Sequence, residues 1–145
     1  MLRVLTAIAL ATLAPLLVGQ LAPNDRLAHA HVSALSGVME EFAAESEVDV
    51  LFGLYHTDVT YEHPRLGVRI GERTMIRRGV ISFLGKTRNP VIEELDRTVG
   101  EGVIVLRLRL SFDTLSNDGW QPTERVQVTI LEITDGLISR IVDYW

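Results

Sequence analysis

The amino-acid sequence predicts an α+β fold in which helices come first and a run of long antiparallel strands follows. Apolar residues recur at helical spacing from Arg26 to Glu45 and again from Met75 to Leu84. From Val91 to Trp145, apolar and polar residues alternate in segments separated by turn-forming residues. Helices followed by antiparallel strands are typical of α+β domains, so we expect a sheet folded over the helices.

The composition indicates one compact domain and excludes several classes of function. The chain has 145 residues, 47% of them hydrophobic, which is enough for a sizeable core. Its net charge of -5, without a dense basic cluster, argues against a nucleic-acid partner. Because the chain has no cysteine, disulfides, thiolate metal sites and a cysteine nucleophile are excluded.

Residues 1–23 are predicted to be a signal peptide or an N-terminal hydrophobic helix, and residues 24–145 to be the domain. The apolar stretch Val4–Val18 follows a positive charge and is too short to span a bilayer comfortably. Cleavage after Ala28-His29-Ala30 would trim the next helix, whereas cleavage near Gly19 would spare it. A signal peptide implies a secreted or periplasmic protein; an ordinary helix or a wrongly chosen start codon implies a cytoplasmic one.

The first helix of the domain is expected to begin at an N-cap formed by Asn24 or Asp25 and to run toward Ser46. Its apolar stripe includes Phe42. The further elements expected before residue 91 are a short helix (Val48–Tyr55), a strand (Asp58–His63) stopped by Pro64, and a helix from Met75 to Leu84, ended by Gly85 and a turn at Asn89-Pro90.

Four long strands are expected after that turn. They are Val91–Val99, Val103–Phe112, Arg125–Ile133 and Leu137–Trp145, joined by turns at Gly100–Gly102, Ser116–Gly119 and Asp135–Gly136. The second strand alternates most regularly, so Leu106, Leu108 and Leu110 share one face, and Arg107 and Arg109 share the other.

The closing strand carries a carboxylate between two large apolar residues. Alternation places Ile141, Asp143 and Trp145 on one face. Such an acid lies either at a boundary or in a pocket. In a pocket, the loss of water raises the pKa of the carboxyl group and makes it a plausible proton acceptor near neutral pH.

Three segments resemble, in order and spacing, the SnoaL-like branch of the nuclear transport factor 2-like superfamily. They are Leu54–Pro64, Gly71–Ile76 and Thr134–Trp145. The resemblance implies a cone-shaped α+β barrel, in which a strongly bent mixed or antiparallel sheet wraps around the helices and encloses a mostly apolar cavity. Relatives include polyketide cyclases, ketosteroid isomerases and limonene-epoxide hydrolases, so the fold alone does not choose the activity. It also makes a homodimer the default expectation.

The resemblance implies roles for particular residues. Asp143 matches an acid/base aspartate, Tyr61 a water-holding tyrosine, and His63 a position that is asparagine in the epoxide hydrolases. The predicted pocket-lining residues are Leu106, Leu108, Leu110, Ile141 and Trp145. The epoxide hydrolases also need an arginine and an aspartate where this chain has Leu108 and Leu110, so their mechanism is not expected here.

Each candidate also has a structural interpretation. Asp143 is equally consistent with a rim or interface residue, His63 with a turn residue before proline, and Tyr61 with a packing residue. Arg107 and Arg109 fit a solvated face or a dimer face paired with Glu124 and Glu132, with an anion site as the alternative.

No metal or cofactor is expected. His29 and His31 are two residues apart, so on a helix they point in different directions and cannot close a metal site together. No glycine-rich nucleotide fingerprint follows a predicted strand.

Two functions remain open. The first is a pocket protein that binds a small apolar molecule. The alternative is a cofactor-independent isomerase, cyclase or lyase, in which Asp143 is the general base on a carbonyl compound and Tyr61 or His63 is the donor.

Overall fold

The computed structural model describes residues 22–145, so the predicted signal segment lies almost entirely outside the described residues. The helices are α2 (Pro23–Val38), α3 (Glu45–Phe52) and α4 (Arg73–Phe83), with a short 3-10 helix η1 (Pro64–Leu66). The strands are β1 (Tyr55–His63), β2 (Val68–Ile70), β3 (Thr87–Gly100), β4 (Val103–Ser116), β5 (Gly119–Thr134) and β6 (Leu137–Tyr144). Within this part of the chain, no helix is both long and apolar enough to cross a membrane.

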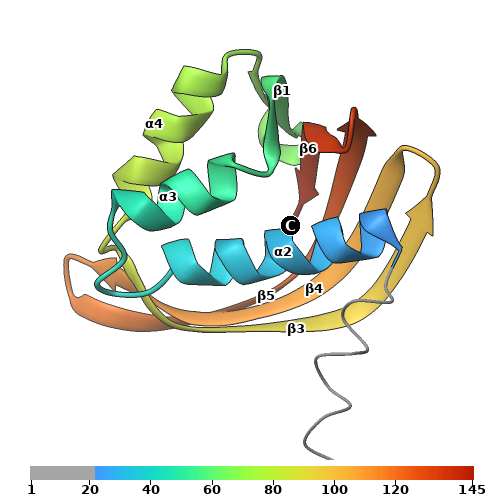
Figure 1. The fold of residues 1–145 in the computed structure, drawn as a ribbon. Helices are drawn as coiled ribbons and strands as arrows, with labels where there is room; N and C mark the ends of the chain where they lie inside the picture. Colours follow the sequence, from blue (N-terminus) through green and yellow to red (C-terminus); the bar gives the residue numbers. More distant parts are fainter. Residues whose placement is uncertain (1–21) are drawn as a thin grey trace, which may run out of the picture.

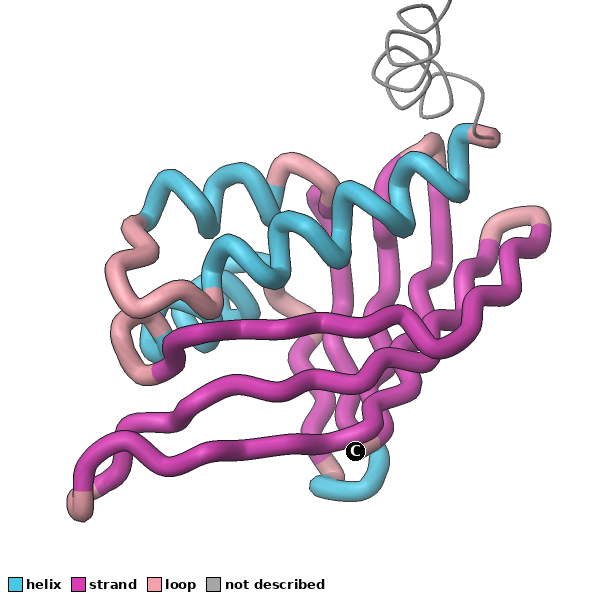
Figure 2. Tube along the Cα trace, turned by 90° about the horizontal axis from the view of Figure 1, so that it is seen from below, coloured by secondary structure: helices cyan, strands magenta, loops and turns pink. Residues whose placement is uncertain are grey.

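The strands form one six-stranded mixed sheet in the order β2-β1-β6-β5-β4-β3. Strands β1 and β6 are parallel, and every other neighbouring pair is antiparallel. The long strands bend, and α2 and α3 lie along the concave side of the sheet (Figures 1 and 2). This arrangement confirms the predicted cone-shaped α+β fold with a strongly bent mixed sheet.

The strand register decides which side chains face the helices. In the β4–β5 hairpin, Leu110 pairs with Arg125 and Leu106 with Thr129. In the β5–β6 hairpin, Thr129 pairs with Asp143. Directly paired residues project from the same face of a sheet. The leucines of β4, the polar residues of β5 and the acid of β6 therefore share the concave face.

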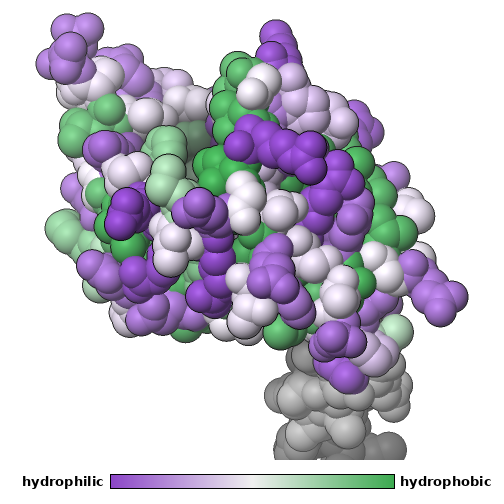
Figure 3. Space-filling view, turned by 90° about the horizontal axis from the view of Figure 1, so that it is seen from above, coloured by the Kyte–Doolittle hydropathy of each residue, from purple (hydrophilic) through white to green (hydrophobic). Residues whose placement is uncertain are grey.

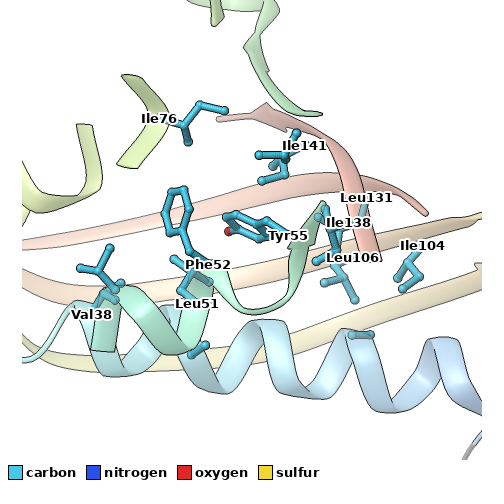
Figure 4. Close-up of a cluster of buried hydrophobic side chains, with 14 of the residues drawn as sticks. Val38, Leu51, Phe52, Tyr55, Ile76, Ile104, Leu106, Leu131, Ile138 and Ile141 are labelled. Atoms are coloured by element: carbon cyan, nitrogen blue, oxygen red, sulfur yellow. The ribbon is translucent and has the colours of Figure 1, made fainter. Parts of the chain in front are cut away.

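The core fills the space between this concave face and the helices (Figure 4). Leu106 and Leu108 are 0% exposed, and Leu110 is 1% exposed. The helices contribute the other half of the core, from Ala28, Ala34, Val38, Val48, Leu51, Phe52 and Ile76. Complete burial of one such leucine stabilises the folded state by roughly 1.5–3 kcal/mol, so the concave face is chiefly a packing surface.

The first predicted helix ends earlier than expected, so the expectation that it continues toward Ser46 was wrong, whereas the short helix expected from Val48 corresponds to α3. α2 ends at Val38, and the buried Thr87 hydroxyl donates a hydrogen bond of 2.8 Å to the carbonyl of Met39. The Glu47 carboxylate accepts the Ala44 N–H at 2.9 Å and caps the start of α3. Phe42 lies in the intervening turn and is 90% exposed, although its spacing fits the helical stripe.

The start of α2 also differs from the prediction. The N-cap is Ala22, and neither Asn24 nor Asp25 occupies that position. Pro23 takes the first helical position, where its missing N–H removes no helical hydrogen bond. Asn24 instead donates to the carbonyl of Gly100 at 3.2 Å, which ties the helix to the end of β3.

Several strand boundaries were wrong as well, including the end of β4 at Ser116 and the start of β5 at Gly119. Tyr55 begins β1 and is not helical, and β2 was not predicted. β3 begins at Thr87 and passes through the expected turn at Asn89-Pro90, where Asn89 has a φ of 52° and the register with β4 shifts. This is a bulge on an edge strand, a place where the sheet tolerates proline.

Candidate functional site

Asp143 lies on the concave face of β6, and two neighbours on β5 hold its carboxylate. The Thr129 hydroxyl donates to Oδ1 at 2.7 Å, and the Gln127 amide donates to the same oxygen at 2.9 Å. The Gln127 amide also donates to the Thr129 hydroxyl oxygen at 2.8 Å. Both bonds end on Oδ1, so Oδ2 is the oxygen available to Tyr61 or to a ligand.

The surroundings of Asp143 raise its pKa. Loss of water is the largest cause, because it disfavours the charged form. Hydrogen bonds from Thr129, Tyr61 and Gln127 and the charge of Arg125 act in the opposite direction, but they do not outweigh the burial. A carboxylate that binds protons more readily is better suited to accept and return a proton near neutral pH.

Two tyrosines of β1 accompany Asp143. Desolvation, the charge of Asp143 and a hydrogen bond with Asp143 all raise the pKa of the half-buried Tyr61. Burial, followed by the charge of Asp143, raises the pKa of Tyr55, which is 7% exposed. Both hydroxyl groups therefore remain protonated, and Tyr61 is a hydrogen-bond donor beside the carboxylate.

His63 comes level with Asp143, because Glu62 pairs with Val142 in the parallel β1–β6 ladder. Its Nδ1 accepts the Leu66 N–H at 3.3 Å and caps η1, so in the neutral ring Nε2 carries the proton. Nε2 is buried and has no partner among the described residues. The ring packs edge-on against Trp145, with centroids 4.6 Å apart, and no hydrogen bond in the described part of the chain joins His63 to Asp143.

Arg125 brings a positive charge to the concave face. Its guanidinium lies 4.1 Å from the ring centroid of Trp145 and 5.5 Å from that of Phe112. Burial lowers the pKa of Arg125, while the nearby Asp143 and Tyr61 act in the opposite direction. The group remains protonated because an arginine starts from so high a pKa.

The five predicted pocket-lining residues share this face, but most of them pack in the core. Leu106, Leu108, Leu110 and Ile141 are buried, whereas Trp145 is 39% exposed at the edge of the site. The view from the side of α4 and β1 shows a hollow bordered by apolar side chains (Figure 3). A cavity that encloses Asp143 stays a prediction.

Two surface hollows of the described part of the chain lie away from Asp143. One, of about 430 Å³, adjoins the α2–α3 turn and is lined by Gly37, Glu40, Glu41, Phe42, Ala43, Glu47 and Asn89. The other, of about 300 Å³, lies over β3, β4 and β5 and is lined by Asn89, Val91, Ser111, Phe112, Asp113, Pro122, Thr123 and Glu124. Neither contains the carboxylate or its two donors.

Arg107 and Arg109 lie on the convex face, away from Asp143. Arg107 is exposed, and Arg109 forms an ion pair with Glu93 of β3. Glu132, one of the partners expected for them, pairs with Arg140 instead. Arg125, in contrast, lies on the concave face near the candidate site.

His31 of α2 is a buried polar residue that faces Tyr55. It is 4% exposed, its ring centroid lies 6.0 Å from that of Tyr55, and its Nδ1 has no partner within residues 22–145. Burial lowers the pKa of His31 to about 4, so the ring is neutral at physiological pH. No three potential metal ligands cluster among the residues that the structure describes.

Comparison with known proteins places the fold. No family model matches this chain, and no curated protein matches it. A hypothetical protein from Catenulispora acidiphila with a ketosteroid isomerase-like fold, solved with trimethylamine, has a TM-score of 0.65 at 15% identity over 82% of this chain and 84% of that one. An M. tuberculosis LEH-like epoxide hydrolase has a TM-score of 0.65 at 15% identity over 84% and 81% of the two chains. A candidate SnoaL-like polyketide cyclase from Shewanella putrefaciens has a TM-score of 0.67 at 12% identity over 86% and 90%.

This chain has the nuclear transport factor 2-like fold. The resemblance of its three sequence segments to that superfamily is thereby confirmed at the level of the fold. The names of these nuclear transport factor 2-like neighbours span an isomerase-like protein, an epoxide hydrolase and a cyclase. Proteins with this fold thus carry different activities, and the fold does not choose among them.

Sequence reasoning missed Thr129, Gln127 and Arg125 at the candidate site. A signal for them was present in the predicted turn between β4 and β5. Counting back from the pair Ser116 and Gly119 places Arg125 opposite Leu110, and it likewise places Gln127 and Thr129 on the leucine face.

Proposed function

We propose that this protein binds a small, largely apolar molecule on the concave face of the sheet and that Asp143 accepts a proton from it. The observation that carries the proposal is that the Asp143 carboxylate is held in one orientation and is partly removed from water. Thr129 and Gln127 fix Oδ1, Tyr61 is a further hydrogen-bond partner of the carboxylate, and the apolar face of β4 lies beside them. A carboxylate held in one orientation and partly removed from water has the properties of a general base.

The reaction class is a proton transfer that requires no cofactor, as in an isomerase, cyclase or lyase. Asp143 would remove a proton from a carbon next to a carbonyl group, and the electron pair would move to the carbonyl oxygen to form an enolate. Tyr61, which remains protonated, or the unpartnered Nε2–H of His63 would donate a hydrogen bond to that oxygen. The proton would return from Asp143 to a different carbon in an isomerisation.

Binding without turnover is the second candidate. It is supported by the lack of a hydrogen bond, among the described residues, between Asp143 and His63, whose Nδ1 is already used to cap η1. In that case Asp143 orients a bound ligand but exchanges no proton with it. The structure solved with trimethylamine is consistent with small-molecule binding in this fold.

Deuterium exchange separates the two candidates. The apolar ketone 2-tetralone, incubated with the protein in D2O, is followed by NMR for loss of the protons next to its carbonyl. General-base catalysis predicts that Asp143→Asn slows the protein-dependent exchange by about 10²–10⁴-fold. Asp135→Asn is the matched control, because Asp135 lies in the exposed β5–β6 turn at a φ of 52°, which asparagine tolerates.

The outcomes of this exchange experiment differ for each candidate. Equal exchange rates in the wild type and both variants would refute proton transfer by Asp143. If 2-tetralone binds to the wild type and to Asp143→Asn but exchanges with neither, binding without turnover is supported. If 2-tetralone shifts no resonance of the wild-type protein, binding of an apolar molecule at this site loses its support.

We also propose that the protein forms a homodimer through the convex face of the sheet. Val126 and Tyr144 project from this face and are 46% and 44% exposed, and both flank Val128. Exposed apolar side chains in one patch favour association. Sedimentation velocity should show a dimer that Val126→Glu disrupts and that Phe42→Ser, at the exposed α2–α3 turn, leaves intact. A wild-type protein that sediments as a monomer at 100 μM would refute the dimer.

A further inference from the structure

The guanidinium of Arg125 lacks hydrogen-bond partners although it lies beside a carboxylate. Among residues 22–145, no side chain or carbonyl accepts a hydrogen bond from it, and no carboxylate oxygen comes within 4.0 Å. Asp143 acts on Arg125 through its charge alone. Partial burial of a cation without hydrogen bonds destabilises the folded state unless another group accepts hydrogen bonds from it.

The described residues around Arg125 do not supply this hydrogen bonding. Trp145 and Phe112 present aromatic rings to the guanidinium, which stabilise its charge but accept no conventional hydrogen bond. The Asp143 Oδ1 atom is already occupied by Thr129 and Gln127. The N–H groups of Arg125 therefore remain available to a molecule that comes from outside the chain.

Arg88 is a second arginine that stacks on a tryptophan, and its guanidinium also has a hydrogen-bond acceptor. Arg88 lies 4.5 Å from the ring centroid of Trp120, and its Nε donates to the Asp113 carboxylate at 3.0 Å. The two sites share an arginine and a tryptophan, and at Arg88 the third component is a planar carboxylate. The planar fork of a guanidinium matches such a group with two parallel hydrogen bonds.

We infer that Arg125 recognises a carboxylate group on the ligand, while the apolar body of the ligand lies against the exposed part of Trp145. The inference rests on the proposed function, because it assigns the chemical class of the molecule bound there. Leu108 and Leu110 are buried in the core, so Trp145, which is 39% exposed, is the apolar side chain beside Arg125 that a ligand could contact. Arg125 would determine the preference for an anionic ligand. The ring of Trp145, on which the guanidinium stacks, would hold Arg125 in position.

The test compares two probes with the same body. Cyclohexanecarboxylate carries the anionic group, cyclohexanecarboxamide is its neutral counterpart, and neither absorbs where tryptophan does. The chain has two tryptophans, so Trp120→Phe leaves Trp145 as the single reporter beside Arg125. Titration of each probe, followed by Trp145 fluorescence, should give at least tenfold tighter binding of the carboxylate.

The matched variants assign that preference to one arginine. In the same background, Arg125→Met should reduce the preference for the carboxylate to less than twofold, and Arg88→Met should preserve it. Arg125→Gln, which retains polarity, replaces Arg125→Met if circular dichroism shows that the methionine variant does not fold.

Three results would overturn the inference. If Trp120→Phe, with Arg125 unchanged, binds the carboxylate and the amide with equal affinity, anion recognition is refuted. Apolar binding, and thus the proposed function, would remain intact. A preference that persists in the Arg125 variants would assign it to another residue. Failure of both probes to bind would remove the proposed function itself, and the inference with it.

Discussion

Replacement of His31 by phenylalanine should remove a defined part of the pH dependence of stability. His31 is 4% exposed, and burial lowers its pKa from 6.5 to about 4. In the unfolded chain the ring is free to bind a proton near pH 6.5. Between these two pKa values the unfolded state therefore binds more protons than the folded state, and stability falls as the pH falls.

The size of the effect follows from the two pKa values of His31. One unit of pKa difference corresponds to about 1.4 kcal/mol, so the change from 6.5 to about 4 amounts to roughly 3 kcal/mol at full extent. Most of this loss, roughly 2.5 kcal/mol, should be complete at pH 4.5. At pH 7.5 the ring is neutral in both states and contributes no pH dependence.

The assay is urea unfolding of the wild type, His31→Phe and His29→Phe at pH 7.5 and pH 4.5. His29 is exposed on the same helix and serves as the control. Relative to His31→Phe, the wild type should lose roughly 2.5 kcal/mol of unfolding free energy between the two pH values. A constant difference between these two proteins would refute the burial of a neutral imidazole, even if phenylalanine changes the stability at both pH values.

Three further predictions concern the site, the core and the leader. Thr129→Val removes a donor from Asp143, so the pKa of Asp143 should rise further, and an unchanged carboxyl titration by NMR would show that the bond is absent. Leu108→Ala should lower the unfolding free energy by about 2–5 kcal/mol in urea. Leu115→Ala, at a side chain that is 46% exposed, should change it by less than about 0.5 kcal/mol, and equal losses would contradict the assigned core. If the protein is exported, mass spectrometry should find cleavage no later than residue 22, because cleavage after Ala30 would remove half of α2; a mature chain beginning at residue 31 would refute this.

The orientation of Asp143 could be anticipated because it depends on local alternation and one tight turn. The residues that hold it depend on pairing between strands. Polar side chains such as Gln127 and Thr129, alternating with valines, have the pattern of an outward face when their strand is considered alone. Only the β4–β5 register, with Leu106 opposite Thr129, shows that they face the core.

The boundaries that differed from the sequence expectation were set by contacts distant in the chain. The helical spacing of Phe42 does not depend on Thr87 and so could not indicate its contact. Thr87 lies 48 residues after Met39 and donates a hydrogen bond to the Met39 carbonyl. The Asn89-Pro90 pair has the composition of a turn, yet β4 pairs on both sides of it and makes it a bulge. Local propensity was overridden in both places by tertiary hydrogen bonding.

The most direct test of an inward-facing, desolvated acid is the titration of the Asp143 carboxyl carbon by NMR in protein labelled with carbon-13 aspartate. The resonance is identified by its loss in Asp143→Asn. A titration midpoint above the ordinary aspartate value of 3.8 is predicted, because burial outweighs the hydrogen bonds to the carboxylate. A midpoint at or below 3.8 would contradict this, because it would mean that desolvation does not outweigh the hydrogen bonds and the charge of Arg125.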